Sequence, residues 1–165
     1  MYCVGDKIVH PMHGAGTIES IVSQTIDGKA REYYVLKLHT NNLTIMVPVD
    51  TSADIGIRDV ISPNEADELL SCFSTIEIDD IPNWNKRCRD NAVKMKSGNL
   101  RDVACVIKSL WYRDLNFGLS TGERKMLHSA LQILISELAI AKNSDKETTK
   151  KQLESLLSEV VTEKS

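Results

Sequence analysis

The spacing of apolar residues changes once along this chain, and that change limits the folds it can adopt. Up to about residue 50 the sequence holds short runs rich in Val, Ile, Thr and Tyr with partial alternation, which is typical of β-strands. From about residue 62 onward, apolar residues recur every three or four positions, which is typical of amphipathic helices. We therefore predict an α+β chain with a small antiparallel β domain at 1–60 and an all-α domain at 61–165.

The β domain is predicted to consist of short strands joined by tight turns. Asp27-Gly28 is a hairpin signal, because a type I′ turn needs positive φ at both central residues, and Asn41-Asn42 is a weaker signal of the same kind. Such strands fit a small antiparallel barrel or curled sheet. The predicted strands span 7–10, 16–25, 32–39 and 43–49.

Capping signals mark the starts of three predicted helices. The segments "SPNE" (62–65) and "STGE" (120–123) are capping boxes, the first with proline at the first helical position. Asn83 is the predicted N-cap of a helix that runs to about Lys96, where "SGN" (97–99) ends it. Further apolar stripes, which we expect to form the helical core, comprise Leu100, Val103, Ala104, Ile107, Leu110, Trp111, Leu127, Ala130, Leu131, Leu134, Leu138, Leu153, Leu156, Leu157, Val160 and Val161.

The formal net charge of −3 conceals an uneven distribution of charge. Residues 1–80 carry five Lys/Arg and thirteen Asp/Glu, a net of −8, whereas residues 81–142 carry eleven and five, a net of +6. The tail from residue 143 carries four and five, a net of −1. A basic block within an acidic protein indicates a polyanionic partner for that block alone. The alternative is that the basic helices are simply solvated.

The four cysteines and the N-terminal segment indicate a protein of the reducing cytoplasm. Cys3, Cys72, Cys88 and Cys105 form no CxxC pair, and we expect reduced, mostly packed thiols. The start "MYCVGDKIVH" lacks the features of a signal peptide, and no apolar run approaches the roughly 20 residues of a membrane span. We therefore expect a cytoplasmic location and no membrane partner.

No catalytic motif stands out. His10, His13 and His39 have a spacing that could serve a metal, but no carboxylate or cysteine completes a ligand set at a recognised spacing. Gly14 and Gly16 fit turn glycines better than a phosphate loop, because no helix with Lys-Ser/Thr follows them. We predict a protein that is not an enzyme and needs no cofactor or metal; a metal hydrolase at the three histidines is the minor alternative.

Trp84 lies at a predicted helix start, between acidic residues and the bases Lys86, Arg87 and Arg89. At helical spacing it can share a buried face with Cys88, which would make it a core residue. Its polar and basic neighbours suit instead an apolar wedge beside phosphate-binding cations, as in proteins that insert side chains between base steps in the minor groove. The residues alone leave both interpretations open.

Seven segments resemble, in order, the CarD/CdnL family of bacterial transcription regulators. They are "VGDKIVHPMHGAGTIESI", "YYVLKL", "LTIMVPV", "GIRDVIS", "NWNKR", "LWYRD" and "GLSTGERKML", and the resemblance spans about residues 2–142. The N-terminal module is also similar to the polymerase-interaction domain of the transcription-repair coupling factor.

The resemblance implies a Tudor-like β domain that docks on the β subunit of RNA polymerase. It also implies a helical domain that contacts promoter DNA at the upstream edge of the transcription bubble. Trp84 falls in the family's "NW" motif, whose tryptophan wedges into the minor groove and stabilises the open complex. Lys86, Arg87 and Arg89 fall on positions that are usually basic and suit contacts with the DNA backbone. One copy is expected in the working complex.

The expected polymerase contact departs from the family pattern. Gln24, before Thr25-Ile26, and Met46, within "LTIMVP", stand where family members often carry basic residues. We therefore expect the contact to use Gln24, Ile26 and Met46 together with main-chain pairing of an exposed edge strand. The alternative function is a protein-only adaptor that binds RNA polymerase or another protein without touching DNA.

Overall fold

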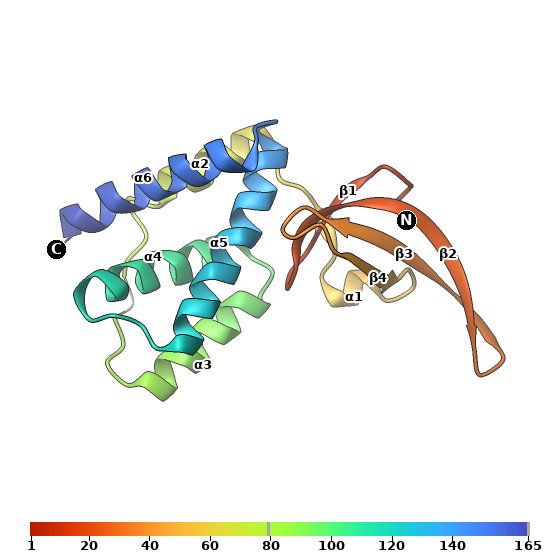
Figure 1. Cartoon of the computed structure of the whole chain (residues 1–165), viewed down its shortest axis with the longest axis horizontal. Coiled ribbons are helices and arrows are strands. Elements are labelled where there is room, and N and C mark those ends of the chain that lie inside the picture. The colour runs from red at the N-terminus through yellow and green to blue at the C-terminus, as the bar shows by residue number, and fades with distance from the viewer. Residues whose placement is uncertain (79, 165) are drawn as a thin grey trace.

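The chain consists of an N-terminal antiparallel sheet followed by a group of helices that lies beside it (Figure 1). The computed structural model describes residues 1–78 and 80–164, with side chains up to Val161. The predicted α+β class, with a small Tudor-like β domain first and helices after it, is confirmed. The first helix of the helical group begins four residues after the last strand ends, and each group has its own apolar core.

The five strands form one sheet in the order β4-β3-β2-β1-β5, in which all neighbours are antiparallel. This order leaves β4 and β5 as the two edges. The strands are β1 (Lys7–His10), β2 (Gly14–Ile26), β3 (Lys29–Leu38), β4 (Thr44–Pro48) and β5 (Arg58–Asp59). The four predicted strands are present, whereas β5 and the short helix α1 (Ser52–Ile55) were not predicted.

A long, curled hairpin of β2 and β3 dominates the sheet (Figure 1). Its turn has φ of 52° at Asp27 and 77° at Gly28, the two positive values that the Asp-Gly signal predicts. A register shift between Ile18 and Ser20 bends the pair, as an extra residue in one strand does. The inner face buries Ile8, Ile18, Tyr34, Leu36, Leu38, Val47 and Ile57.

The helices begin where the capping signals place them. Side chains of Ser62 and Ser120 form complete capping boxes, and Asn83 caps the helix that opens with Trp84. The helices are α2 (Pro63–Cys72), α3 (Trp84–Lys96), α4 (Leu100–Asn116), α5 (Thr121–Ala141) and α6 (Lys146–Lys164).

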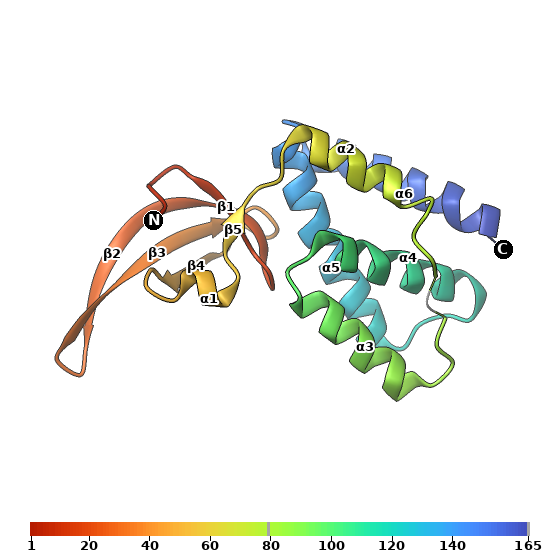
Figure 2. The same cartoon turned by 180° about the vertical axis from the view of Figure 1, so that it is seen from behind.

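Helix α5 lies at the centre of the molecule and packs against α2, α4 and α6 on one side and against β2 on the other (Figure 2). The helical core consists largely of the predicted apolar stripes, and Trp111 packs against it from a partly buried position. Among the helices that the structure describes, none is both long and apolar enough to cross a bilayer.

Candidate nucleic-acid interface

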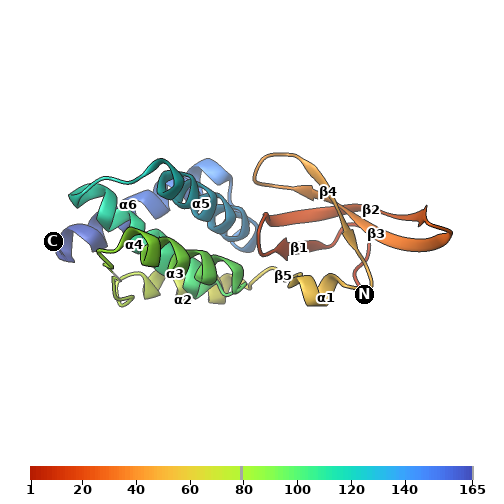
Figure 3. The ribbon, with the colours of Figure 1, turned by 90° about the horizontal axis from the view of Figure 1, so that it is seen from below.

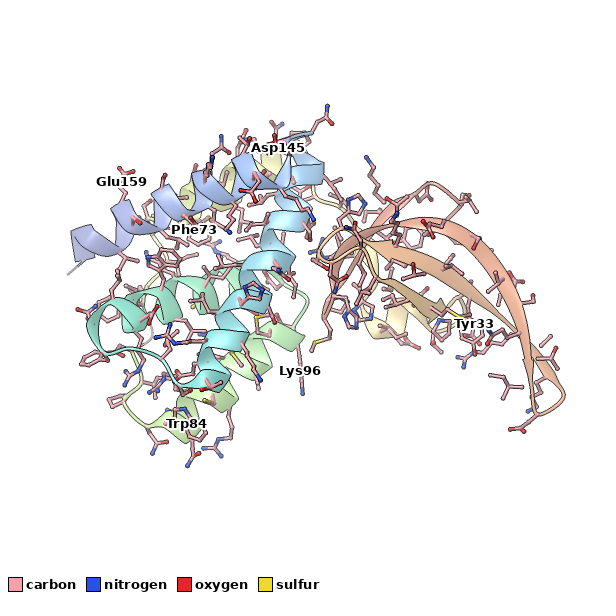
Figure 4. All side chains as sticks on the ribbon, in the orientation of Figure 1. Tyr33, Phe73, Trp84, Lys96, Asp145 and Glu159 are labelled. Atoms are coloured by element: carbon pink, nitrogen blue, oxygen red, sulfur yellow. The ribbon has the colours of Figure 1, made fainter. Side chains whose placement is uncertain are left out.

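The N-termini of α3 and α5 meet at one end of the helical part, and Trp84 lies there (Figure 4). The Asn83 side chain accepts a hydrogen bond from the Lys86 main-chain N–H at 2.9 Å, which fixes the first turn of α3. Ser120 caps α5 and also accepts a hydrogen bond from the indole N–H of Trp84 at 3.2 Å. Ser120 therefore caps α5 and also orients the tryptophan at the start of α3.

Trp84 remains 52% exposed although its N–H is held. It lies on the same side of α3 as Met95, which is buried, so the helical spacing indicated the right face. The first turn of α3 extends beyond the helical core, and the indole therefore projects past it. Trp84 is thus a surface residue, and the core interpretation is wrong for it.

Arg87 does not occupy the surface position that the resemblance implied. Its side chain is 6% exposed, and its guanidinium donates to Glu123 with Nε–Oε2 and Nη2–Oε1 distances of 2.7 and 3.1 Å. It also donates to the carbonyl oxygens of Ile81 and Pro82. The hydrogen bond between the two side chains is the main cause that raises the pKa of Arg87 and lowers the pKa of Glu123. Arg87 is therefore not available for the expected phosphate contact and instead joins α3 to α5.

Lys86 and Arg89 are exposed and, among the described residues, form no ion pair. They lie on the outer side of α3 together with Val93, which is 69% exposed. The first turn of α3 contains no acidic residue, and the Glu123 carboxylate in the first turn of α5 is neutralised by Arg87. Two helix N-termini and two free cations therefore give this end of the molecule a positive potential, which favours an anion.

The three predicted polymerase-contact residues lie on the β2–β3–β4 side of the sheet. Gln24 of β2 and Met46 of β4 come together, with 3.8 Å between the amide nitrogen and the sulfur. Ile26 lies two residues further along β2 and is 56% exposed. It takes no part in the contact between Gln24 and Met46. Met46 is 42% exposed, so Ile26 and Met46 expose apolar side chains, Met46 from the edge strand itself, and the polar Gln24 amide contacts Met46.

The main chain of β4 is open on its outer side. At its two ends Leu43 and Val49 bond to β3 with N···O distances of 2.8 and 3.0 Å. Because bonded and non-bonded pairs alternate in an antiparallel ladder, the main-chain groups of Thr44 and Met46 point away from β3. Pro48 follows, and it has no N–H, as is usual on edge strands. An added partner strand could pair with Thr44 and Met46.

The three histidines serve local structure. The rings of His10 and His13 lie 4.6 Å apart, and His10 Nδ1 accepts a hydrogen bond from the Met12 main-chain N–H. His39 bonds to the Thr17 hydroxyl at 2.9 Å. Within the described residues, no three His, Cys, Asp or Glu side chains are placed to hold a metal ion together.

Sequence reasoning did not assign Ser120 or Glu123 to this site, although both were predicted as helix caps. The separation of 36 residues between each of them and its partner on α3 gives no local signal. Phe117 was also missed; it is 67% exposed, and the Arg113 guanidinium lies 4.9 Å from its ring centroid. Arg113 in turn pairs with Asp80, just before α3, so this loop belongs to the same end of the molecule.

The chain thus combines a small sheet that has an open edge at β4 with a helical part that exposes Trp84 beside the cations Lys86 and Arg89. Residues 2–61 match the family "CarD-like/TRCF RID domain", and residues 68–154 match "CarD, C-terminal domain". Over 155 residues the chain is 34% identical to the "Putative transcription factor YdeB" of Bacillus subtilis (strain 168), covering 94% of this chain and 99% of that protein.

The chain therefore belongs to the CarD family, as the sequence resemblance indicated. CarD-like families are transcription factors and not known enzymes, and membership gives this chain a transcription-related role that involves interaction with RNA polymerase.

Proposed function

We propose that this protein docks on the β subunit of RNA polymerase and places Trp84 against promoter DNA at the upstream edge of the transcription bubble, stabilising the open complex. The observation that carries the proposal is the half-exposed indole at the start of α3, held by Ser120 and followed by the exposed cations Lys86 and Arg89.

An exposed tryptophan at this place suits insertion beside a partly unstacked base step. Apolar side chains that enter the minor groove unstack a step at a cost of a few kcal/mol and need cations nearby to hold the DNA backbone. Lys86 and Arg89 lie within two helical turns of Trp84 and are available for phosphates. A wedge with two phosphate contacts senses how easily DNA deforms more than which bases it contains. DNA binding by the free protein should therefore be weak and barely sequence-selective.

Docking on polymerase is proposed to use strand addition. The β part has few basic residues, and its edge strand β4 leaves the main chain of Thr44 and Met46 open. Main-chain hydrogen bonds of this kind supply affinity, and neighbouring side chains supply specificity. The uncharged side chains of Gln24, Ile26 and Met46 lie on or near that edge and take the place of the usual basic contacts.

The two surfaces work together because one tethers the other. Once the sheet is docked, a single copy holds Trp84 at high effective concentration near the promoter, so weak DNA contacts suffice. No bond in DNA or nucleotide changes in this scheme, and no cofactor takes part.

The decisive experiment monitors the upstream edge of the bubble with a fluorescent base analogue. Adding the full chain to a polymerase–promoter complex should change the analogue's fluorescence and slow the decay of the complex after competitor is added. Trp84→Ala should remove both effects, whereas Val4→Glu, a change at an exposed residue that precedes β1 and lies in no strand or helix, should keep them. A wild-type chain that binds polymerase but leaves the analogue and the decay unchanged would point to the protein-only adaptor instead.

A further inference from the structure

Helix α5 runs from the start of α3 to the sheet (Figures 1 and 3). Side-chain hydrogen bonds join its N-terminal end to Trp84 and its later part to the sheet. Its start holds the α3 helix through Ser120 and Glu123. Its later part contacts the sheet through two adjacent residues, Ser136 and Glu137. We propose that α5 is a rigid strut in which Ser136 and Glu137 are positioning residues that fix where Trp84 lies relative to docked polymerase. The inference rests on the proposed function.

Glu137 is fully buried, and its carboxylate accepts hydrogen bonds from β5 and from the segment between β5 and α2. Its carboxylate receives both Arg58 terminal nitrogens, at 2.7 and 2.8 Å, and the Ile61 main-chain N–H at 3.0 Å. Arg58 belongs to the edge strand β5. A planar guanidinium bound through two parallel hydrogen bonds resists rotation as well as separation, so this pair fixes an angle.

The same guanidinium reaches a third element. Arg58 Nε donates to the carbonyl oxygen of Gly98 at 3.4 Å, in the turn between α3 and α4. One arginine of the sheet therefore contacts α5 directly and also the far end of the helix that begins with Trp84.

Ser136 forms the second attachment, on β2, which is separated from β5 by β1 in the sheet. The Ala15 main-chain N–H of β2 donates to the Ser136 hydroxyl at 3.0 Å, and both groups are buried. Gly14 makes this approach possible: a β-carbon there would lie 2.8 Å from the Ser136 oxygen and 3.3 Å from the Ile133 Cα. At this attachment the main chain of β2 thus bonds directly to the short Ser136 side chain.

Because both attachments lie near the C-terminal end of α5, a small rotation there produces a larger displacement at the N-terminal end. Ser120 and Glu137 are 17 residues apart, so the tryptophan end lies about 25 Å from the anchor at 1.5 Å per residue. A tilt of about 6° at the anchor would move that end by roughly 2.5 Å, which is most of the ~3.4 Å between successive bases on a strand. A wedge must enter one base step, so the anchor has to hold the angle to within a few degrees.

The test compares Glu137→Gln and Ser136→Ala with Asp67→Asn. This control removes an exposed ion pair between α2 and Lys142, the C-cap of α5, and leaves both attachments to the sheet in place. Each variant carries a photo-crosslinking p-benzoylphenylalanine at position 85, next to Trp84. The parent and the control should crosslink to one promoter position in the polymerase complex. In Glu137→Gln and Ser136→Ala the crosslinks should spread to neighbouring nucleotides while affinity for polymerase stays within twofold.

The open-complex lifetime gives the second readout. If about one variant molecule in five holds the native angle, the stabilising effect should fall about fivefold. Faster amide exchange at Ala15 in the free chain should show that the interface has opened. If Glu137→Gln fails to fold, Ser136→Ala decides, because it removes one hydroxyl and no charge.

The outcomes separate the two proposals. Crosslinks at the parent's position and an unchanged lifetime in a variant whose Ala15 amide exchanges faster would overturn the strut and leave the proposed function standing. A parent chain that binds polymerase but never crosslinks to DNA would overturn the proposed function and, with it, the strut.

Discussion

Arg87 of α3 and Glu123 of α5 form a buried ion pair between the first turns of the two helices, with both side chains less than a tenth exposed. The carboxylate that accepts from Arg87 also takes part in the capping box of α5. The same Ser120 hydroxyl that completes this box accepts from Trp84. One buried pair thus holds the starts of two helices in register, and the exposed indole depends on both.

Arg87→Ala is expected to destabilise the protein rather than to weaken a phosphate contact. Removing one partner of a buried pair leaves Glu123 uncompensated and should lower the free energy of unfolding by about 3–5 kcal/mol. Urea unfolding checks this, with the exposed Arg89→Ala as control, which should change the free energy by less than about 0.5 kcal/mol. Equal stability of both variants would contradict the buried pair.

Lys86 and Arg89 should carry the salt dependence of promoter binding. Each phosphate contact adds about 0.9 to the slope of log affinity against log salt, so Lys86→Ala and Arg89→Ala should each flatten it by about that amount. The weakening should be similar for different promoter sequences, because phosphates are the same in all of them. The slope is measured on polymerase–promoter complexes at several salt concentrations. A slope that neither variant alters would assign both residues to a solvated face.

The helix starts could be predicted from the sequence because capping is local. Ser62, Asn83 and Ser120 each accept a hydrogen bond from the main-chain N–H three positions on, so the pattern lies within a few residues. The Asp27-Gly28 turn was predictable for the same reason. The two-residue strand β5 and the four-residue helix α1 are too short to show a period.

The role of Arg87 could not be predicted locally, because its partner lies 36 residues away on another helix. Sequence alone grouped it with Lys86 and Arg89 as one basic cluster, whereas the helix turns it inward and its neighbours outward. Trp84 shows the opposite error in the core interpretation: the face was right, but the helix start projects beyond the core. Whether each side chain is buried or exposed depends on how far the neighbouring helices extend, and the periodicity of the sequence carries no information about that.

Met46→Glu should weaken binding to the polymerase β subunit without unfolding the sheet. Met46 is exposed on an edge strand, so a charge there costs little in the free protein but would be buried when a partner strand is added. Val4→Glu makes the same chemical change at a residue that is 60% exposed and lies outside the strands. Calorimetric titration of the β subunit compares the two. Equal affinity of both variants would mean that docking uses another surface.

Stability should fall as the pH drops below the ordinary range of histidine, through His10. Burial, with a smaller contribution from His13, lowers the pKa of His10 from 6.5 to about 4. Its Nδ1 accepts the Met12 N–H at 3.0 Å, so a second proton would have to displace that bond. The unfolded chain therefore binds more protons between these two pH values, and stability rises with pH across that window and levels off above it.

His10→Asn checks this assignment, because asparagine places an acceptor near the position of Nδ1 but does not titrate. Urea midpoints measured between pH 4 and 6.5 should rise less steeply with pH in the variant than in the parent. The same slope in both proteins would show that His10 does not titrate with folding.

Trp84→Ala should shorten the lifetime of the open complex and leave polymerase binding intact. Stacking of an aromatic side chain on a base is worth roughly 1–3 kcal/mol, which corresponds to about a five- to 150-fold change in lifetime. Thermal stability should change little, because the indole is already 52% exposed and loses one hydrogen bond to Ser120. Truncation of a core tryptophan would instead cost roughly 3–5 kcal/mol of folding stability.

Trp84→Phe separates stacking from orientation. Phenylalanine keeps an aromatic face but cannot donate to the Ser120 hydroxyl, so it should give a lifetime between those of the parent and Trp84→Ala. Ser120→Ala would confound the test, since the same oxygen caps α5 and bonds to Glu123. The melting temperature and the decay of competitor-challenged complexes are measured on all three proteins. A folded Trp84→Ala whose complexes decay as slowly as those of the parent would rule out the wedge, because every other contact of the protein with polymerase remains in that variant.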